Sequence, residues 1–260
     1  MRETRTSAGW GHLLGVLVVA PLLVLPVRAA ADVWRAPALL PHELGTRGFD
    51  VLASPGTRVG EAVVTSLLVA VVATCVGMLL AWPAARGLAA VPAGARPALV
   101  AVLAMPLLVP QFATGTGLTT WFLRLGLADR AAGLVLAHLV YLLPYAVLIL
   151  APAFDDRVRR LEEAARTAGA GTLARLRFVT LPAAARPLTV AALLGFLVSW
   201  SQYGTSLAVG GGRLTLPVVL LPFVERDPQV AATLSLVFLV PPLVALGVVA
   251  AAWRRSSVRP

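Results

Sequence analysis

The most constraining feature of this sequence is a series of long apolar windows separated by arginine-rich segments. A helix needs about 20 predominantly apolar residues to cross the hydrocarbon core of a bilayer. An arginine at the centre of such a helix costs about 2.5–3.5 kcal/mol on insertion scales. Six windows meet this length, and all but the first are free of charged residues: 11–31, 62–85, 97–123, 131–154, 187–208 and 229–253. The sequence therefore predicts an all-α polytopic membrane protein with six transmembrane helices.

The alternative, a soluble helical core, is disfavoured by composition. Hydrophobic residues make up 58% of the chain, against about 45–50% in a typical soluble domain. The mean hydropathy is +0.85. The first window leaves a second choice open, because Arg2 and Arg5 precede it and a small-residue segment follows it, as in a secretory signal peptide. We favour a retained helix, and cleavage would leave five spans in the same orientation.

The distribution of positive charge predicts the orientation of the spans. All 22 basic residues are arginines. With the N-terminus inside, 14 of these 22 fall in cytoplasmic segments, as the positive-inside rule requires. Both termini are then expected in the cytoplasm of a bacterial cell with the chain in its inner membrane. The net charge of +10 is thus attributed to topology and acidic lipid, not to nucleic acid.

Several classes of chemistry are disfavoured by residues that the sequence lacks. Without lysine, the chain has neither the P-loop that binds ATP phosphates nor a Schiff-base site. The single Cys75 and three histidines predict no internal disulfide and no metal site. The glycine-rich segment 210–213 is expected to form an external turn. His138, a readily titratable group in the window 131–154, is expected to be a hydrogen-bonded packing residue and not a proton shuttle.

One charged strip, residues 157–182, interrupts the apolar pattern on the predicted cytoplasmic side. Helical spacing predicts an apolar face formed by Val158, Leu161, Ala165 and Ala168. The polar face is expected to hold Arg159, Glu162, Glu163 and Arg166. Asp155 and Asp156 suit the positive N-terminal end of this helix. Gly169 and Gly171 should break this helix. A second short helix, capped by Thr172, is expected to end near Pro182.

Two short helices joined by a glycine elbow suit a groove on another protein, whereas a solvated loop on the lipid surface is the alternative. The spacing favours docking. Glu163-Ala164-Ala165, three residues, Gly169, nine residues and then Val179-Thr180-Leu181-Pro182 resembles the EAA loop of membrane-spanning subunits of binding-protein-dependent ABC importers. In that family an isoleucine stands at the position of Val179. The resemblance runs from about residue 59 to residue 250 and is nearest to the branch of polyamine, iron and thiamine permeases.

This resemblance implies the type I permease fold, with a permease domain at 59–252 and the EAA loop at 155–186. Residues 1–58 would form the N-terminal tail, first helix and external loop, and 253–260 a cytoplasmic tail. The loop would hold the coupling helix that docks on a dimer of ATP-binding subunits. A second permease, either a copy or a paralogue, and an extracytoplasmic solute-binding protein would complete the transporter. ATP would be bound by the partner, with no cofactor, catalytic residue or metal in this chain. The residues expected to couple to the ATPase are Glu163, Ala164, Ala165, Gly169, Val179, Leu181 and Pro182.

A translocation path is expected where polar residues and helix breakers coincide inside a window, because irregular backbone is tolerated there only beside protein or water. The alternative is ordinary polar packing between helices. The candidates are Gln111, Thr114, Thr116, Ser199, Ser201, Gln202 and Tyr203. Polyamine permeases tend to have acids where Ser201 and Gln202 stand, which puts a polycationic substrate in doubt. An ion-coupled secondary transporter acting alone is the competing function, and a membrane enzyme lacks a convincing set of reactive residues.

Overall fold

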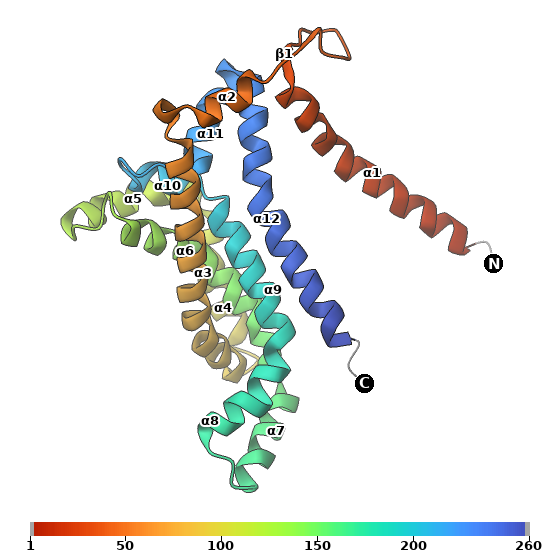
Figure 1. Cartoon of the computed structure of the whole chain (residues 1–260). Helices are drawn as coiled ribbons and strands as arrows, with labels where there is room; N and C mark the ends of the chain where they lie inside the picture. The colour runs from red at the N-terminus through yellow and green to blue at the C-terminus, as the bar shows by residue number, and fades with distance from the viewer. Residues whose placement is uncertain (1–2, 258–260) are drawn as a thin grey trace. The chain divides into compact units, whose positions relative to one another are not determined.

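A computed structural model describes residues 3–257 of the chain, which are almost entirely helical (Figure 1). Two strands form a small antiparallel hairpin, β1 (Ala31–Val33) and β2 (Glu43–Leu44). The longer helices are α1 (Glu3–Ala29), α3 (Val59–Ala90), α4 (Arg96–Leu108), α5 (Gln111–Arg124), α6 (Ala131–Leu150), α7 (Asp156–Thr167), α9 (Leu181–Trp200), α11 (Leu216–Arg226) and α12 (Pro228–Ser257). The shorter ones are α2 (Arg47–Ala53), α8 (Thr172–Arg175) and α10 (Gly204–Val209). Two 3-10 turns, Pro55–Thr57 and Ala151–Phe154, and a π-helical turn, Leu176–Thr180, complete the described chain.

The predicted spans correspond to helices of suitable length, with one difference in shape. Four helices are long and apolar enough to cross a membrane: Val59–Ala90, Ala131–Phe154, Thr172–Trp200 and Pro228–Arg254. The window 97–123 is not one straight helix, because α4 and α5 meet at an angle of 91°. Counted as one span, this pair is the fifth. The apolar part of α1, Gly15–Ala29, is shorter than the other spans, so a sixth span stays a prediction.

Contacts divide the described chain into two compact units. The first unit comprises residues up to 60 together with 216–243, and the second comprises 61–215 together with the chain from 244 onward. The long helix α12 contributes its first half to one unit and its second half to the other.

The core of the second unit is formed where α6 packs between α3 and α9. Leu142 of α6 is fully buried, and it lies against a glycine on each neighbour. A Cβ on Gly77 of α3 would lie 2.3 Å from the Leu142 Cδ2 atom, and one on Gly195 of α9 would lie 3.3 Å from its Cγ atom. Small residues at helix interfaces allow this close packing in a bilayer, where van der Waals contact drives association.

A second contact of this unit places α5 against α10. The Thr119 hydroxyl lies 2.8 Å from the carbonyl oxygen of Ala208 and 2.9 Å from that of Gly115 in its own helix. After α10 the chain reverses through residues 210–213, where Gly211 has a φ of +56°. The Asp129 carboxylate accepts a hydrogen bond from the Gly212 amide at 2.9 Å. The predicted turn at 210–213 is therefore confirmed.

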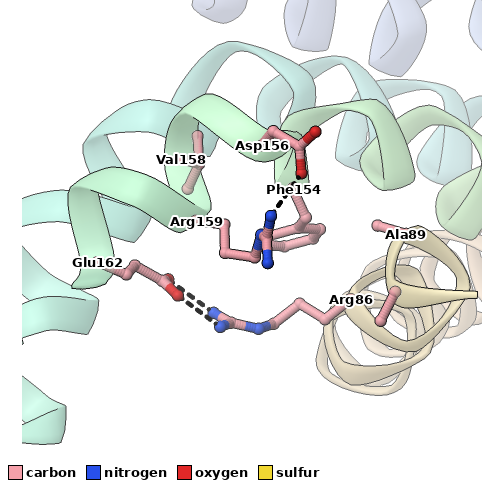
Figure 2. A pocket seen from close by; sticks show the side chains of 8 residues that line it. Arg86, Ala89, Phe154, Asp156, Val158, Arg159 and Glu162 are labelled. Carbon is pink, nitrogen blue, oxygen red and sulfur yellow. Dashed lines mark hydrogen bonds and ion pairs between the residues drawn. The ribbon is translucent and has the colours of Figure 1, made fainter.

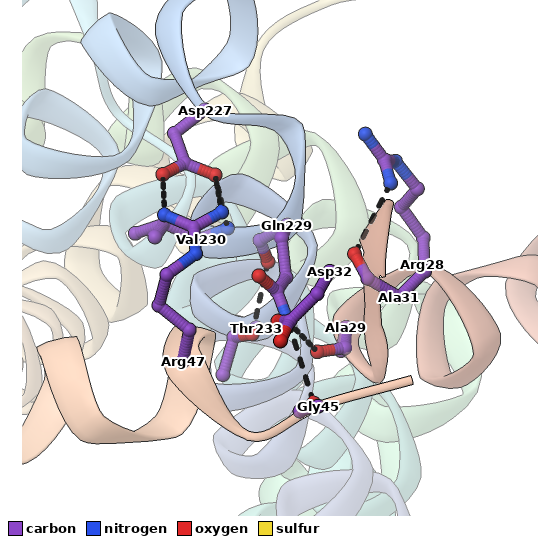
Figure 3. A network of polar contacts seen from close by, with 10 residues as sticks. All are labelled: Arg28, Ala29, Ala31, Asp32, Gly45, Arg47, Asp227, Gln229, Val230 and Thr233. Carbon is purple, nitrogen blue, oxygen red and sulfur yellow. Dashed lines mark hydrogen bonds and ion pairs between the residues drawn. The ribbon is translucent and has the colours of Figure 1, made fainter. Parts of the chain in front are cut away.

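In the first unit, a buried glutamine fixes the start of α12 to the segment after α1 (Figure 3). Gln229 is 1% exposed, and its Nε2 atom lies 2.6 Å from Asp32 Oδ1 and 3.3 Å from the carbonyl oxygens of Ala29 and Gly45. Beside it, Arg47 of α2 makes a bidentate ion pair with Asp227. The sequence predicted an external loop in this region, and no local pattern indicated this network.

Candidate functional site

The EAA loop begins with a capped helix. The Asp155 carboxylate accepts a hydrogen bond from the Val158 amide at 2.9 Å, and Asp156 occupies the first turn of α7. A side-chain oxygen at this position satisfies one of the amides that a helix start leaves unpaired, and acids there favour the helix dipole. The predicted role of the two acids is confirmed.

The predicted glycine elbow is present and follows the helix-ending geometry of a Schellman motif. The Gly169 amide bonds to the carbonyl of Arg166 at 3.0 Å, and the Ala170 amide bonds to that of Ala165 at 2.9 Å. Gly169 has a φ of +86°, and an added Cβ there would meet nothing within 4 Å. The glycine is therefore required by the left-handed backbone angle and not by close approach of a neighbour.

Two details of the second helix differ from the prediction. Thr172 does not cap it: Gly171 occupies the N-cap position, and the Thr172 hydroxyl instead accepts a hydrogen bond from Arg175 at 3.2 Å. Pro182 does not end it either, since it is the second residue of α9 and the helix runs on to Trp200. The π-helical turn before it, where the Leu181 amide bonds to the Leu176 carbonyl, accommodates the proline, which has no amide hydrogen to donate.

The faces of α7 also differ from the prediction. Val158 is buried as expected, but Leu161 is 46% exposed and Ala168 is exposed, whereas Glu162 is turned inward. Helical spacing alone cannot reveal this reversal, because an inward glutamate needs a partner that comes from a distant part of the chain.

The loop thereby presents apolar side chains on its outer surface. Leu173 and Phe178 are 76% and 71% exposed. Of the predicted coupling residues, Glu163, Ala164, Gly169, Leu181 and Pro182 are exposed, and Ala165 and Val179 are half-buried.

The partner of Glu162 is Arg86, near the end of α3 (Figure 2). Their two hydrogen bonds, Nη1 to Oε1 at 3.0 Å and Nη2 to Oε2 at 2.8 Å, form a bidentate pair. Thr180, which is 1% exposed, donates its hydroxyl to the same carboxylate. Burial alone would raise the pKa of Glu162, but the hydrogen bonds from Arg86 and Thr180 and the nearby charge of Arg175 lower this pKa below its ordinary value.

Aromatic rings support the Arg86 side of this contact. The guanidinium carbon of Arg86 lies 5.4 Å from the centre of the Phe154 ring, within the range of a cation–π interaction. Phe154 in turn meets Trp82 edge-on, with ring centres 5.0 Å apart. Neither Arg86 nor Glu162 was among the predicted site residues, because the pair is separated by 76 positions and has no fixed sequence spacing.

A cavity of about 480 Å³ lies at the break between α4 and α5. Among the described residues, no charged side chain lines it. The lining residues are Leu107, Leu108, Val109, Pro110, Gln111, Tyr141, Tyr145, Val198 and Ser201. The Tyr141 hydroxyl donates to the Val109 carbonyl at 3.0 Å and lies 2.8 Å from the Thr114 hydroxyl. The Tyr141 hydroxyl thereby gives a hydrogen-bond partner to the Val109 carbonyl, which the break leaves without a partner in the helix.

Two of the predicted path residues, Gln111 and Ser201, line this cavity. Thr114 lies behind it, bonded to Tyr141, and Thr116 is exposed and bonds back to its own helix. Gln202 is buried and accepts from Thr205 at 2.7 Å, and Tyr203 is half-buried. The structure therefore brings together only part of the predicted set.

The remaining candidate, Ser199, belongs to a buried polar chain. Its hydroxyl lies 2.8 Å from His138 Nδ1, and His138 Nε2 lies 2.9 Å from the Ser206 hydroxyl. Ser206 donates its proton to the Gln202 carbonyl at 2.8 Å, so it accepts from Nε2, and Ser199 donates to Nδ1. His138 is 2% exposed, and the prediction that it is a hydrogen-bonded packing residue is confirmed.

No group of three or more histidine, cysteine, aspartate or glutamate side chains that could hold a metal occurs among residues 3–257.

Comparison with known proteins identifies the family. The chain is 34% identical over 176 residues to the ABC transporter permease protein ORF1 of Streptomyces antibioticus, covering 64% of this chain and 74% of that protein. It is 27% identical over 214 residues to the thiamine transport system permease protein ThiP of Brucella abortus, covering 75% of this chain and 39% of ThiP. It is 27% identical over 170 residues to the trehalose transport system permease protein SugB of Mycobacterium tuberculosis, covering 65% of this chain and 62% of SugB. No protein-family model matches the chain.

The chain thus spans three quarters of the first relative but less than two thirds of the other two. It belongs to the ABC transporter permease proteins and is an integral membrane protein. It is a permease subunit of an ABC importer.

Proposed function

We propose that this permease subunit passes a small solute across the bacterial inner membrane, driven by a separate ATP-binding subunit that docks on the EAA loop. The observation that carries this proposal is the exposed apolar surface of the loop, formed by Leu161, Leu173 and Phe178. Glu163, in the same helix as Leu161, is also exposed. Apolar surface next to polar side chains is typical of an interaction site, and helices joined by a fixed elbow fit a groove on a partner.

The proposed orientation puts this loop and both termini in the cytoplasm. It is supported by the 14 of 22 arginines that fall on that side. ATP is then bound by the partner, and this chain contributes no cofactor site. A second permease, a copy or a paralogue, faces this one, and a binding protein outside delivers the solute. Transport follows from a helix bundle with two states, whose balance the docked ATPase shifts.

The cavity at the α4–α5 break is the proposed contact point for the solute within this subunit. Gln111 and Ser201 present hydrogen-bonding groups there, and Tyr141 and Tyr145 add ring surface. Because none of the described residues that line the cavity is charged, it favours an uncharged solute over a polycation. The other predicted path residues, Thr114, Thr116, Ser199, Gln202 and Tyr203, do not line this cavity, and their part in the path stays a prediction from the sequence.

The test is reconstitution with the partners. We expect the chain, co-expressed with its ATP-binding subunit, to purify as a complex and to take up solute only when ATP is supplied. The solute can be found by screening the binding protein for ligand-induced melting shifts against vitamins, amines, sugars and metal complexes. Failure to form the complex would refute docking of the ATPase. Uptake by the chain alone on an ion gradient would indicate a secondary transporter.

The cavity has its own test in the same vesicles. We expect Gln111→Ala to raise the half-saturating solute concentration about fivefold, since one hydrogen bond is worth about 1 kcal/mol. Thr120→Val, on the exposed side of α5, serves as the matched control. Equal uptake kinetics for the two variants would remove Gln111 from the path.

A further inference from the structure

The attachment of the EAA loop to the rest of its unit depends on few polar contacts. The ion pairs that Arg159 makes, with Asp156 at 3.1 Å and Glu163 at 4.0 Å, stay within α7. The elbow at Gly169 has open space around it. Glu162, by contrast, reaches both α3 and the π-helical turn that leads into α9.

The geometry of the Glu162 contact resists movement in more than one direction. A bidentate pair between a guanidinium and a carboxylate fixes orientation as well as distance, and Thr180 holds the carboxylate from a second element. The Glu162 side chain is 16% exposed and that of Arg86 is 42% exposed, so the carboxylate is the more sheltered partner of the pair. Figure 2 shows Arg86 of α3 reaching toward Glu162 of α7 across a second pocket, which both side chains line.

Adjacent glutamates on α7 therefore have different surroundings. Successive residues of a helix point about 100° apart, so Glu163 faces outward while Glu162 faces the bundle. An outward glutamate can meet a docked protein. An inward one that links three elements can pass a movement of α7 to the rest of the unit.

Building on the proposed function, we propose that Glu162 is a positioning residue: with Arg86 and Thr180 it makes the EAA loop move as one rigid body with the adjoining ends of α3 and α9. A push on α7 by the ATPase then displaces these two spans directly. The movement of α7 is then not lost by bending at the Gly169 elbow or at the turn 151–154.

Spin labels can test rigid-body motion without knowledge of the solute. One label is placed at Gly87→Cys on α3, where an added side chain meets nothing within 4 Å, and one at Arg160→Cys on the exposed side of α7. The free Cys75 is first replaced by serine. The labelled permease, purified in complex with its ATP-binding subunit, is measured by pulsed EPR with and without ATP and vanadate.

We expect one narrow distance distribution between the labels that ATP does not change. In the Glu162→Gln background, ATP should produce a second, displaced population. The double charge exchange Arg86→Glu with Glu162→Arg should restore the single population. Asp156→Asn, which breaks an ion pair inside α7, is the matched control and should behave as the parent does.

A distance that shifts with ATP when Glu162 is intact would overturn the proposal, as would an unchanged distribution in the Glu162→Gln complex. If Glu162→Gln fails to fold, Arg86→Gln provides the same comparison from the other side. Loss of complex formation by the unmutated protein would instead refute docking of the ATPase, so the two failures are distinguishable.

Discussion

At the scale of single residues, the structure assigns different constraints to Gly169 and Gly171, which lie two positions apart. Gly169 needs its positive φ, whereas Gly171 has an ordinary extended backbone with φ of −66°. Open space surrounds both glycines. Any difference between substitutions at the two positions will therefore report backbone conformation.

We expect Gly169→Val to abolish ATP-driven transport while membrane insertion remains intact. A residue with a Cβ pays about 1–2 kcal/mol in the left-handed region, and a β-branched one pays more. The helix should therefore run past the elbow and misdirect the apolar surface of the loop. Co-purification with the ATP-binding subunit measures the loss of docking, and Gly171→Ala is the control variant. Normal uptake by Gly169→Val would count against the docking function.

The carboxylate of Glu162 should make stability depend on pH. Its pKa is lowered from an ordinary value of 4.5, so the folded state favours the ionised form. The stabilisation is fully present above about pH 4.5 and is lost as the pH falls through the folded pKa. The groups that face it are Arg86, Arg175 and Thr180.

Melting temperatures of the wild type and Glu162→Gln should accordingly differ most near neutral pH and converge in acid. Subtracting one curve from the other removes the titration of carboxylates common to both proteins. A difference that stays constant down to pH 3 would mean that the lowered pKa contributes nothing to folding.

At the scale of elements, the broken third span shows what the sequence could and could not predict. Pro106 and Pro110 are helix breakers within the predicted span 97–123, and the structure has a 91° bend there. The size of the bend was not predictable, because contacts at the break come from another helix, as when the Tyr141 hydroxyl of α6 bonds to the Val109 carbonyl. The capped start and the glycine elbow of the loop were predicted, since local residues determine them. The inward turn of Glu162 was not, since its partner comes from α3.

We expect Tyr141→Phe to lower the melting temperature of the purified subunit and Tyr145→Phe to leave it nearly unchanged. The first removes a hydroxyl that bonds to the Val109 carbonyl and to Thr114. The groups left unpaired are partly buried, so the cost should lie toward the lower end of the roughly 1–3 kcal/mol that full burial gives. The Tyr145 side chain is 40% exposed and makes no hydrogen bond to the described part of the chain. Equal melting temperatures would show that the bend does not depend on this contact.

At the scale of the whole molecule, the proposed orientation can be checked with a single cysteine. In a Cys75→Ser background, Ala164→Cys lies on the exposed outer surface of the EAA loop, and Leu40→Cys lies in the exposed segment between β1 and β2. We expect a membrane-impermeant maleimide added to intact cells to label residue 40 only, and residue 164 to react only after permeabilisation. Labelling of residue 164 from outside would reverse the topology and remove the docking function.

The bend between α4 and α5 has a consequence for subunits that have not yet found their partners. Helices of 13 and 14 residues rise only about 20 Å each, so neither is long enough to cross the hydrocarbon core alone. Counted as one span, the pair has its junction within the bilayer. Unpaired backbone is costly wherever lipid surrounds it. An unassembled copy should therefore be short-lived in cells and cleared by membrane quality-control proteases, and its abundance should follow the supply of the other subunits.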